Sequence, residues 1–175
     1  FGKVGAIDGT FTQEGNYATL LFNGEYKFII PNNQGPFLWK KTSGGNPDTL
    51  IMNVNGSQQL DIEVTPYYMI RNAQISGSGT TVTGTFKAEK IITDANAKDI
   101  QEVALYINKT QFVSQADQVA KTTKTGAEIS DLNNISLSVA VPAMVPTQSY
   151  VFARVAIRIA GVEDMILSPV VKIQL

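Results

Sequence analysis

The feature that most constrains the fold of this chain is an alternation of apolar and polar residues with a period of two, which recurs along most of its length. Successive side chains of a strand point to opposite faces, so this alternation predicts half-buried strands. Short runs of Gly, Asn, Asp and Pro separate the alternating segments, as turns do. No window keeps an apolar stripe at helical spacing over three turns. The sequence therefore predicts an all-β fold with no helix longer than two turns.

Residues 50–65 show the pattern at its clearest. Leu50, Met52 and Val54 share one face, and the apolar residues of 60–64 repeat the alternation. Between them stands Asn55-Gly56, which is typical of a two-residue hairpin turn. We therefore expect residues 50–54 and 60–64 to form a hairpin, with Asp61 and Glu63 on its solvent-exposed face.

The length of 175 residues allows one large β domain or two small ones. A break is expected at Thr65-Pro66-Tyr67, because proline cannot donate a hydrogen bond to a central ladder and marks a strand end or a hinge. Residues 1–66 then form a first β-sandwich. Residues 67–175 hold about seven short strands, which is the size of an immunoglobulin-like or fibronectin-III-like sandwich.

Composition excludes several kinds of chemistry. The chain has no His and no Cys, which removes Ser-His-Asp triads, Cys-His dyads and Cys/His zinc sites. Its formal net charge is −1, so no nucleic-acid partner is expected. Residues 94–99 carry oxygen ligands at alternate positions, but Lys98 occupies the place of a third ligand and no Gly follows. We expect no catalytic residues, no metal site and no cofactor.

Aromatic residues supply the one indication of ligand binding. Trp39, the only tryptophan, lies near Phe37 in the connection 32–48, and the flanking lysines favour partial exposure. An exposed indole could stack on the apolar face of a sugar ring. Alternatively, Trp39 and Phe37 close the bottom of the first domain, since large aromatic side chains are mostly buried. Tyr67 and Tyr68, at the domain join, are either further ligand contacts or packing between the two domains.

Two segments together resemble a known family. Residues 8–11 (Asp-Gly-Thr-Phe) and 21–28 (Leu-Phe-Asn-Gly-Glu-Tyr-Lys-Phe), followed by a hairpin, resemble the carboxypeptidase-regulatory-like, transthyretin-like β-sandwich. The join at residues 63–67 leads into the Ig-like part. This combination is similar to a domain-of-unknown-function family of Bacteroidetes surface lipoproteins that is linked to polysaccharide utilisation. Such a first domain normally begins with more strand, so here it is expected to be short and N-terminally incomplete.

The resemblance implies a non-catalytic accessory protein of the cell surface or outer membrane. Its expected partners are a polysaccharide or oligosaccharide and outer-membrane glycan-uptake proteins. Membrane contact is expected only through a lipid anchor that this chain does not contain. The alternative is a structural or adhesive spacer that acts through protein–protein contacts. Trp39 distinguishes the two hypotheses: an exposed ring favours ligand binding, whereas a buried ring favours the spacer.

Overall fold

The computed structural model describes residues 5–12 and 14–175, and it divides the chain into two compact units. The first unit runs up to Ile29 and resumes over Thr49–Ile62. The second comprises Ile30–Asp48 and Glu63–Leu175. The division is therefore discontinuous: the segment Ile30–Asp48, which a continuous boundary at residue 66 would give to the first domain, belongs to the second unit.

A two-stranded antiparallel ribbon is the regular part of the first unit. Strand β1 (Gly24–Phe28) pairs with β3 (Leu50–Val54), with Tyr26 opposite Met52. The face that carries Tyr26 and Met52 is half-buried, as their alternation with polar residues predicts. Tyr17 extends this face: its ring lies 6.2 Å from that of Phe28, and its hydroxyl donates to the Leu60 carbonyl at 2.7 Å.

The expected hairpin between residues 50–54 and 60–64 is not formed, because β1 takes the place of its second strand. Gly56 adopts φ +81° at the predicted turn, and its amide donates to the Asn23 side chain at 3.2 Å. Gln58 donates from its side chain to the Asn53 carbonyl at 2.9 Å. These bonds hold the chain in a turn that leaves the ribbon. Residues 57–64 contain no strand, although Asp61 and Glu63 are exposed as expected.

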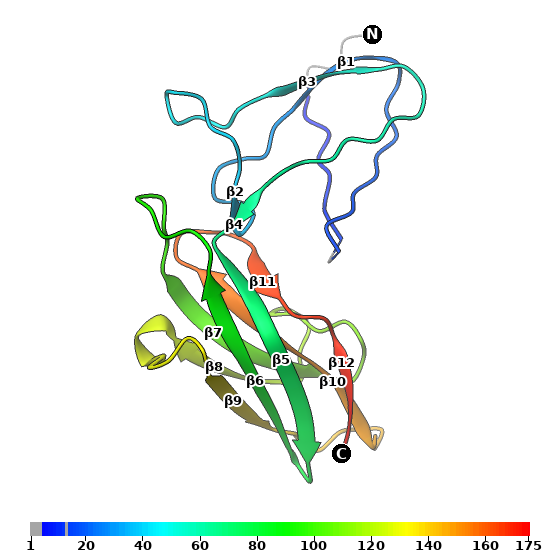
Figure 1. The fold of residues 1–175 in the computed structure, drawn as a ribbon. Helices are drawn as coiled ribbons and strands as arrows, with labels where there is room; N and C mark the ends of the chain where they lie inside the picture. Colours follow the sequence, from blue (N-terminus) through cyan, green and yellow to red (C-terminus); the bar gives the residue numbers. More distant parts are fainter. Residues whose placement is uncertain (1–4, 13) are drawn as a thin grey trace. The chain divides into compact units, whose positions relative to one another are not determined.

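The second unit contains an antiparallel β-sandwich, which confirms the predicted all-β fold (Figure 1). One sheet has the order β5-β6-β9: β5 (Tyr68–Ser78), β6 (Thr81–Lys90) and β9 (Ile135–Ala140). The other has the order β11-β10-β7-β8, and β12 also pairs with β10: β7 (Ile100–Asn108), β8 (Ala120–Thr125), β10 (Tyr150–Ile159), β11 (Met165–Leu167) and β12 (Val171–Gln174). The helical structure within the described residues is one 3₁₀ turn, Gly126–Glu128.

The sandwich core lies between the two sheets and follows the alternation in the sequence. Val82, Phe86 and Ala88 of β6 are buried, as are the alternate residues of β7 and β10. Gly84 lies at a close approach of the two sheets: a Cβ at this position would be 2.9 Å from Val155 Cγ1. The absence of a side chain at residue 84 therefore allows this close approach.

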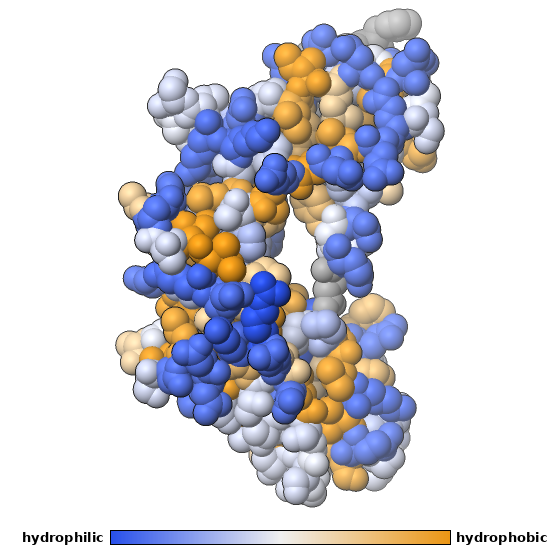
Figure 2. Space-filling model, in the orientation of Figure 1, coloured by the Kyte–Doolittle hydropathy of each residue, from blue (hydrophilic) through white to orange (hydrophobic). Residues whose placement is uncertain are grey.

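Several apolar side chains of both units lie on the surface. Leu20 is fully exposed, and Phe22, Phe112 and Val145 are largely exposed. In the view of Figure 2, hydrophobic residues form separate patches among hydrophilic ones. Scattered apolar residues of this kind are normal on protein surfaces. No helix in the described part of the chain is long and apolar enough to cross a membrane.

Candidate functional site

The segment Ile30–Asp48 is attached to the strand that leads into the sandwich. Strand β2 (Phe37–Leu38) pairs with β4 (Thr65–Pro66), so that Phe37 lies opposite Pro66. The Tyr67 amide then donates to the Pro36 carbonyl at 3.1 Å. The segment thereby brings its side chains beside Tyr67.

The second half of this segment folds into a short hairpin. The Asp48 amide donates to the Lys40 carbonyl at 2.9 Å, and the Thr42 amide donates to the Asn46 carbonyl at 2.9 Å. The Asn32 side-chain amide donates to the Gly45 carbonyl at 3.3 Å. Since Asn32 uses its nitrogen to hold the hairpin, its side-chain oxygen remains available as an acceptor.

Asn33 attaches the first half of the segment to two loops of the sandwich. Its backbone has φ +64°, a conformation that asparagine tolerates better than most residues. Its carbonyl accepts from the Glu163 amide at 2.8 Å. Its side-chain oxygen accepts from Lys98 Nζ at 2.9 Å, and Lys98 also donates to the Gly161 carbonyl at 3.2 Å. These bonds attach the start of the segment to the sandwich.

Trp39 is buried, with 7% of its surface exposed. Its indole Nε1 donates to the Asp48 carbonyl at 3.2 Å, which closes the base of the hairpin. Burial agrees with the alternative in which Trp39 is a packing residue, and the residue belongs to the second unit. The partial exposure that the flanking lysines favoured is not observed, so Trp39 offers no open indole face for a sugar.

The other three aromatic residues singled out from the sequence have different environments. Phe37 is half-buried in β2. Tyr67 and Tyr68 are each 3% exposed and belong to the hydrophobic core of the sandwich, where the sequence had allowed for packing between domains. Trp39, Phe37 and Tyr67 meet around one small pocket, whereas Tyr68 does not line it. Their role in ligand binding stays a prediction.

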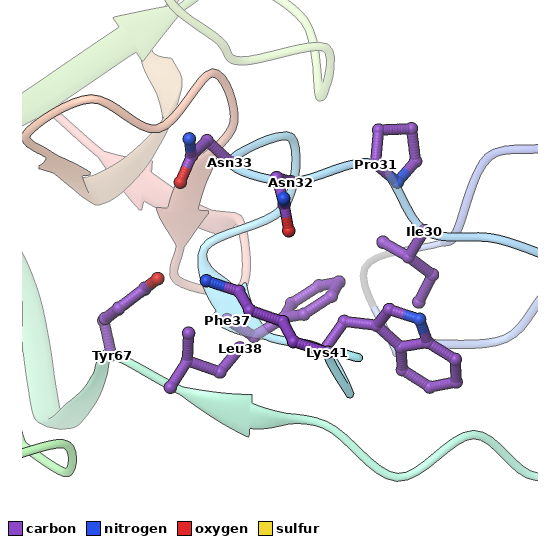
Figure 3. Close-up of a pocket in the computed structure, with 9 residues that line it drawn as sticks. Ile30, Pro31, Asn32, Asn33, Phe37, Leu38, Lys41 and Tyr67 are labelled. Carbon is purple, nitrogen blue, oxygen red and sulfur yellow. The ribbon is translucent and has the colours of Figure 1, made fainter. Parts of the chain in front are cut away.

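This pocket is a shallow polar notch, which we define by the nine residues that line it: Ile30, Pro31, Asn32, Asn33, Phe37, Leu38, Trp39, Lys41 and Tyr67 (Figure 3). In Figure 3 the hydroxyl of Tyr67 and the amine end of Lys41 point toward one another. The side-chain oxygen of Asn32 points toward the side on which Lys41 lies. The notch has a volume of about 10 Å³, which is room for about one water molecule. It can therefore admit a single projecting group of a ligand, not a whole ring.

The hydroxyl of Tyr67 is the distinctive group of the polar notch. It makes no hydrogen bond to any other described residue, although the side chain is almost entirely buried. No fully buried polar side-chain atom among the described residues lacks a partner, so this hydroxyl must retain contact with solvent through the notch. Burial raises the pKa of Tyr67, which keeps the phenol protonated and able to donate.

Sequence reasoning missed Asn32, Asn33 and Lys41, the polar members of the notch. Two signals could have found them. Asn32 and Asn33 follow Pro31 at the start of a long connection, and asparagine pairs in such positions favour unusual backbone angles. Lys41 lies two residues after Trp39, which suggests that both residues belong to one local structure.

The carboxylates of Asp61, Asp94 and Asp99 lie in ordinary turns and surface contacts. Asp61 accepts from the Gln59 side chain at 3.1 Å, and Asp94 accepts from the Asn96 amide at 2.8 Å. Asp99 lies 3.5 Å from Lys90 Nζ. Over residues 5–12 and 14–175, no group of three or more acidic residues is placed to hold a metal ion.

A second, larger hollow of about 350 Å³ lies in the sandwich. It is lined by Gly79, Thr80, Val141, Pro142, Ala143, Met144, Thr147, Gln148 and Leu175. The Gln148 amide already donates to the Lys109 and Tyr150 carbonyls, at 3.0 and 2.7 Å. With no charged or aromatic residue and its one amide donor engaged, this hollow is a weaker candidate for recognition than the polar notch.

Several solved structures share this architecture. A DUF3823 family protein from Bacteroides ovatus is 26% identical, with a TM-score of 0.76 over 97% of this chain and 84% of its own. One from Parabacteroides merdae is 27% identical, with a TM-score of 0.77 over 96% and 79%. A Bacteroides uniformis protein, provisionally named a carbohydrate binding protein, is 18% identical, with a TM-score of 0.68 over 94% of this chain and 80% of its own. At this low identity, the similarity shows a shared fold and nothing more.

Sequence comparison agrees with the structural one. No curated protein sequence gives a significant match. Two family profiles match instead: residues 1–65 match the protein of unknown function (DUF3823) N-terminal domain, and residues 68–172 match the domain of unknown function DUF3823_C. Together these matches cover almost the whole chain, and this chain therefore belongs to the DUF3823 family.

Proposed function

We propose that this chain is a non-catalytic carbohydrate-binding module that serves a polysaccharide-utilisation system at the outer surface of the cell. The observation that carries the proposal is the Tyr67 hydroxyl, a donor on a buried side chain that opens into the polar notch without a partner among the described residues. Asn32 and Lys41 add an acceptor and further donors. Sugar hydroxyl groups both donate and accept, so this set matches their chemistry.

Two further observations support carbohydrate recognition without catalysis. The Bacteroides uniformis protein that shares this fold is provisionally named for carbohydrate binding. The chain lacks His and Cys, and the carboxylates considered above contact neighbouring side chains or backbone. A glycosidase needs two carboxyl groups across a bound sugar, and the polar notch is lined by none.

The burial of Trp39 favours a second candidate, a structural or adhesive spacer. A buried indole cannot stack on the apolar face of a sugar ring. On this second hypothesis the hairpin of residues 40–48 is a scaffold element, and the exposed faces of the module contact other proteins. The two candidates differ in whether the purified chain binds any polysaccharide.

The test is affinity electrophoresis and calorimetry of the purified chain with a panel of neutral and acidic polysaccharides. Tyr67→Phe removes the hydroxyl and keeps the ring in the core. It should weaken binding by about 1–1.5 kcal/mol, which is roughly 5–13-fold. Tyr68→Phe is the matched control, because Tyr68 is equally buried but does not line the notch, and it should bind as the wild type does. Failure of the wild type to bind any glycan would reject the proposal and leave the spacer hypothesis.

A further inference from the structure

The polar notch contains a positive charge that the protein does not neutralise. Lys41 is the one charged residue among the nine that line it. The salt bridges between described residues are Arg71–Glu89 and Lys90–Asp99, so no carboxylate of the described chain pairs with Lys41. The ammonium group of Lys41 also makes no hydrogen bond to a described residue and is left with three donors.

A second ammonium group lies beside the same site. Lys98 Nζ is 5.6 Å from the centre of the Tyr67 ring, and both of its hydrogen-bond acceptors are neutral oxygens, on Asn33 and Gly161. The positive charge of Lys98 is therefore not cancelled by a paired carboxylate. Lys41 and Lys98 therefore both bring a positive charge to the surroundings of Tyr67.

Two acidic residues, Glu163 and Asp164, adjoin this segment through their backbones. Glu163 and Asp164 donate from their backbone amides to the carbonyls of Asn33 and Gln34, at 2.8 and 2.9 Å. Partial burial raises the pKa of Asp164, and the neighbouring charge of Glu163 raises it further. Neither carboxylate forms a salt bridge with Lys41 or Lys98.

We propose, on the basis of the carbohydrate-binding function above, that the polar notch recognises an acidic sugar and takes the carboxylate of a uronic acid. One carboxylate oxygen enters the notch, which has room for about one water-sized atom, and accepts hydrogen bonds from Lys41 and the Tyr67 hydroxyl. The Asn32 side-chain oxygen accepts a hydrogen bond from a neighbouring sugar hydroxyl. A site with charged donors and one neutral acceptor fits a carboxylate better than a hydroxymethyl group.

The experiment compares acidic polysaccharides with neutral ones. The acidic set is polygalacturonate, alginate and hyaluronan, and the neutral set is galactan, xylan and dextran. Fully methyl-esterified polygalacturonate is the matched control ligand, because it keeps the sugar backbone and loses the charge. We expect the wild type to bind at least one acidic polymer, with an affinity that falls as salt is raised. Esterification should remove the binding to polygalacturonate if that is the polymer bound.

Two lysine variants separate the notch from general surface charge. Lys41→Met removes the ammonium group and keeps the aliphatic stem, and we expect it to weaken binding to the acidic polymer by about 3–5-fold. Lys40→Met removes the adjacent exposed lysine, which does not line the notch, and should change affinity by less than about 2-fold.

The outcomes distinguish this inference from the function on which it rests. Binding to neutral polymers alone, or equal effects of the two lysine variants, would overturn the acidic-sugar inference and leave carbohydrate binding in place. Binding to no polymer in the panel would overturn both. Binding to an acidic polymer that is weakened by Lys41→Met and by Tyr67→Phe, but not by Lys40→Met, is the result that the structure leads us to expect.

Discussion

Truncation of Trp39 should release the segment Ile30–Asp48 while leaving the sandwich folded. Replacing a buried tryptophan by alanine costs about 3–5 kcal/mol, because it leaves a cavity and removes apolar burial. Trp39→Phe keeps most of the ring and deletes the hydrogen bond from the indole to the Asp48 carbonyl, which is worth about 1 kcal/mol. Trp39 does not belong to the buried cluster of the sandwich, so we expect the loss to fall on the local stability of the segment.

Native-state hydrogen exchange followed by NMR measures this local stability. The reporting amides are those of Asp48, Tyr67 and Glu163, which donate to carbonyls of the segment. In Trp39→Ala their exchange should accelerate more than about 100-fold, and in Trp39→Phe about 5-fold, while amides in β7 and β10 keep their wild-type rates. Unchanged exchange at all three reporting amides would refute the reasoning. A uniform acceleration across the sandwich would also refute it, because Trp39 would then be part of the cooperative core.

Two further predictions concern the sandwich itself. Gly84→Ala places a methyl group 2.9 Å from Val155 Cγ1 and should lower the free energy of unfolding in urea by about 1–3 kcal/mol. The control is Gly44→Ala, where there is room for the methyl group, and it should change this free energy by less than about 0.5 kcal/mol. Equal effects of the two substitutions would contradict the packing argument. The hydrogen bond from Arg71 lowers the pKa of Glu89. The stabilisation that Glu89 gives the folded state is therefore present above the ordinary pKa of glutamate and is lost as pH falls through the lowered pKa. Glu89→Gln should make the urea midpoint less sensitive to acid between about pH 5 and pH 3. An unchanged pH profile would count against this pairing.

The alternation in the sequence predicted the faces of most strands, but it could not predict which strands are covered on both sides. Val103, Leu105 and Ile107 of β7 face the core as expected. Ala104 and Tyr106, on the other face, are also fully buried, in a second cluster with Val113. A period-two pattern reports one buried face, and only the tertiary structure shows that a loop covers the other.

The candidate site could be predicted only in part, because a pairing between distant residues forms it. The aromatic signal drew attention to Trp39, Phe37, Tyr67 and Tyr68, and the first three of these side chains line the notch. The pairing of Phe37 with Pro66 could not be read from the sequence, since a two-residue strand has no periodicity. Without that pairing, nothing in the sequence brings Asn32 or Lys41 close to Tyr67.

Mapping of bound ligand by NMR tests the central claim, that the polar notch is the recognition site, most directly. The labelled chain would be titrated with oligosaccharides from the polymer that it binds. Trp39, as the only tryptophan, supplies a single indole signal inside the notch. The account predicts that the largest shift changes occur at Asn32, Asn33, Lys41 and Tyr67 and at the Trp39 indole. Changes confined to the β1–β3 ribbon, or to the hollow around Met144, would contradict it.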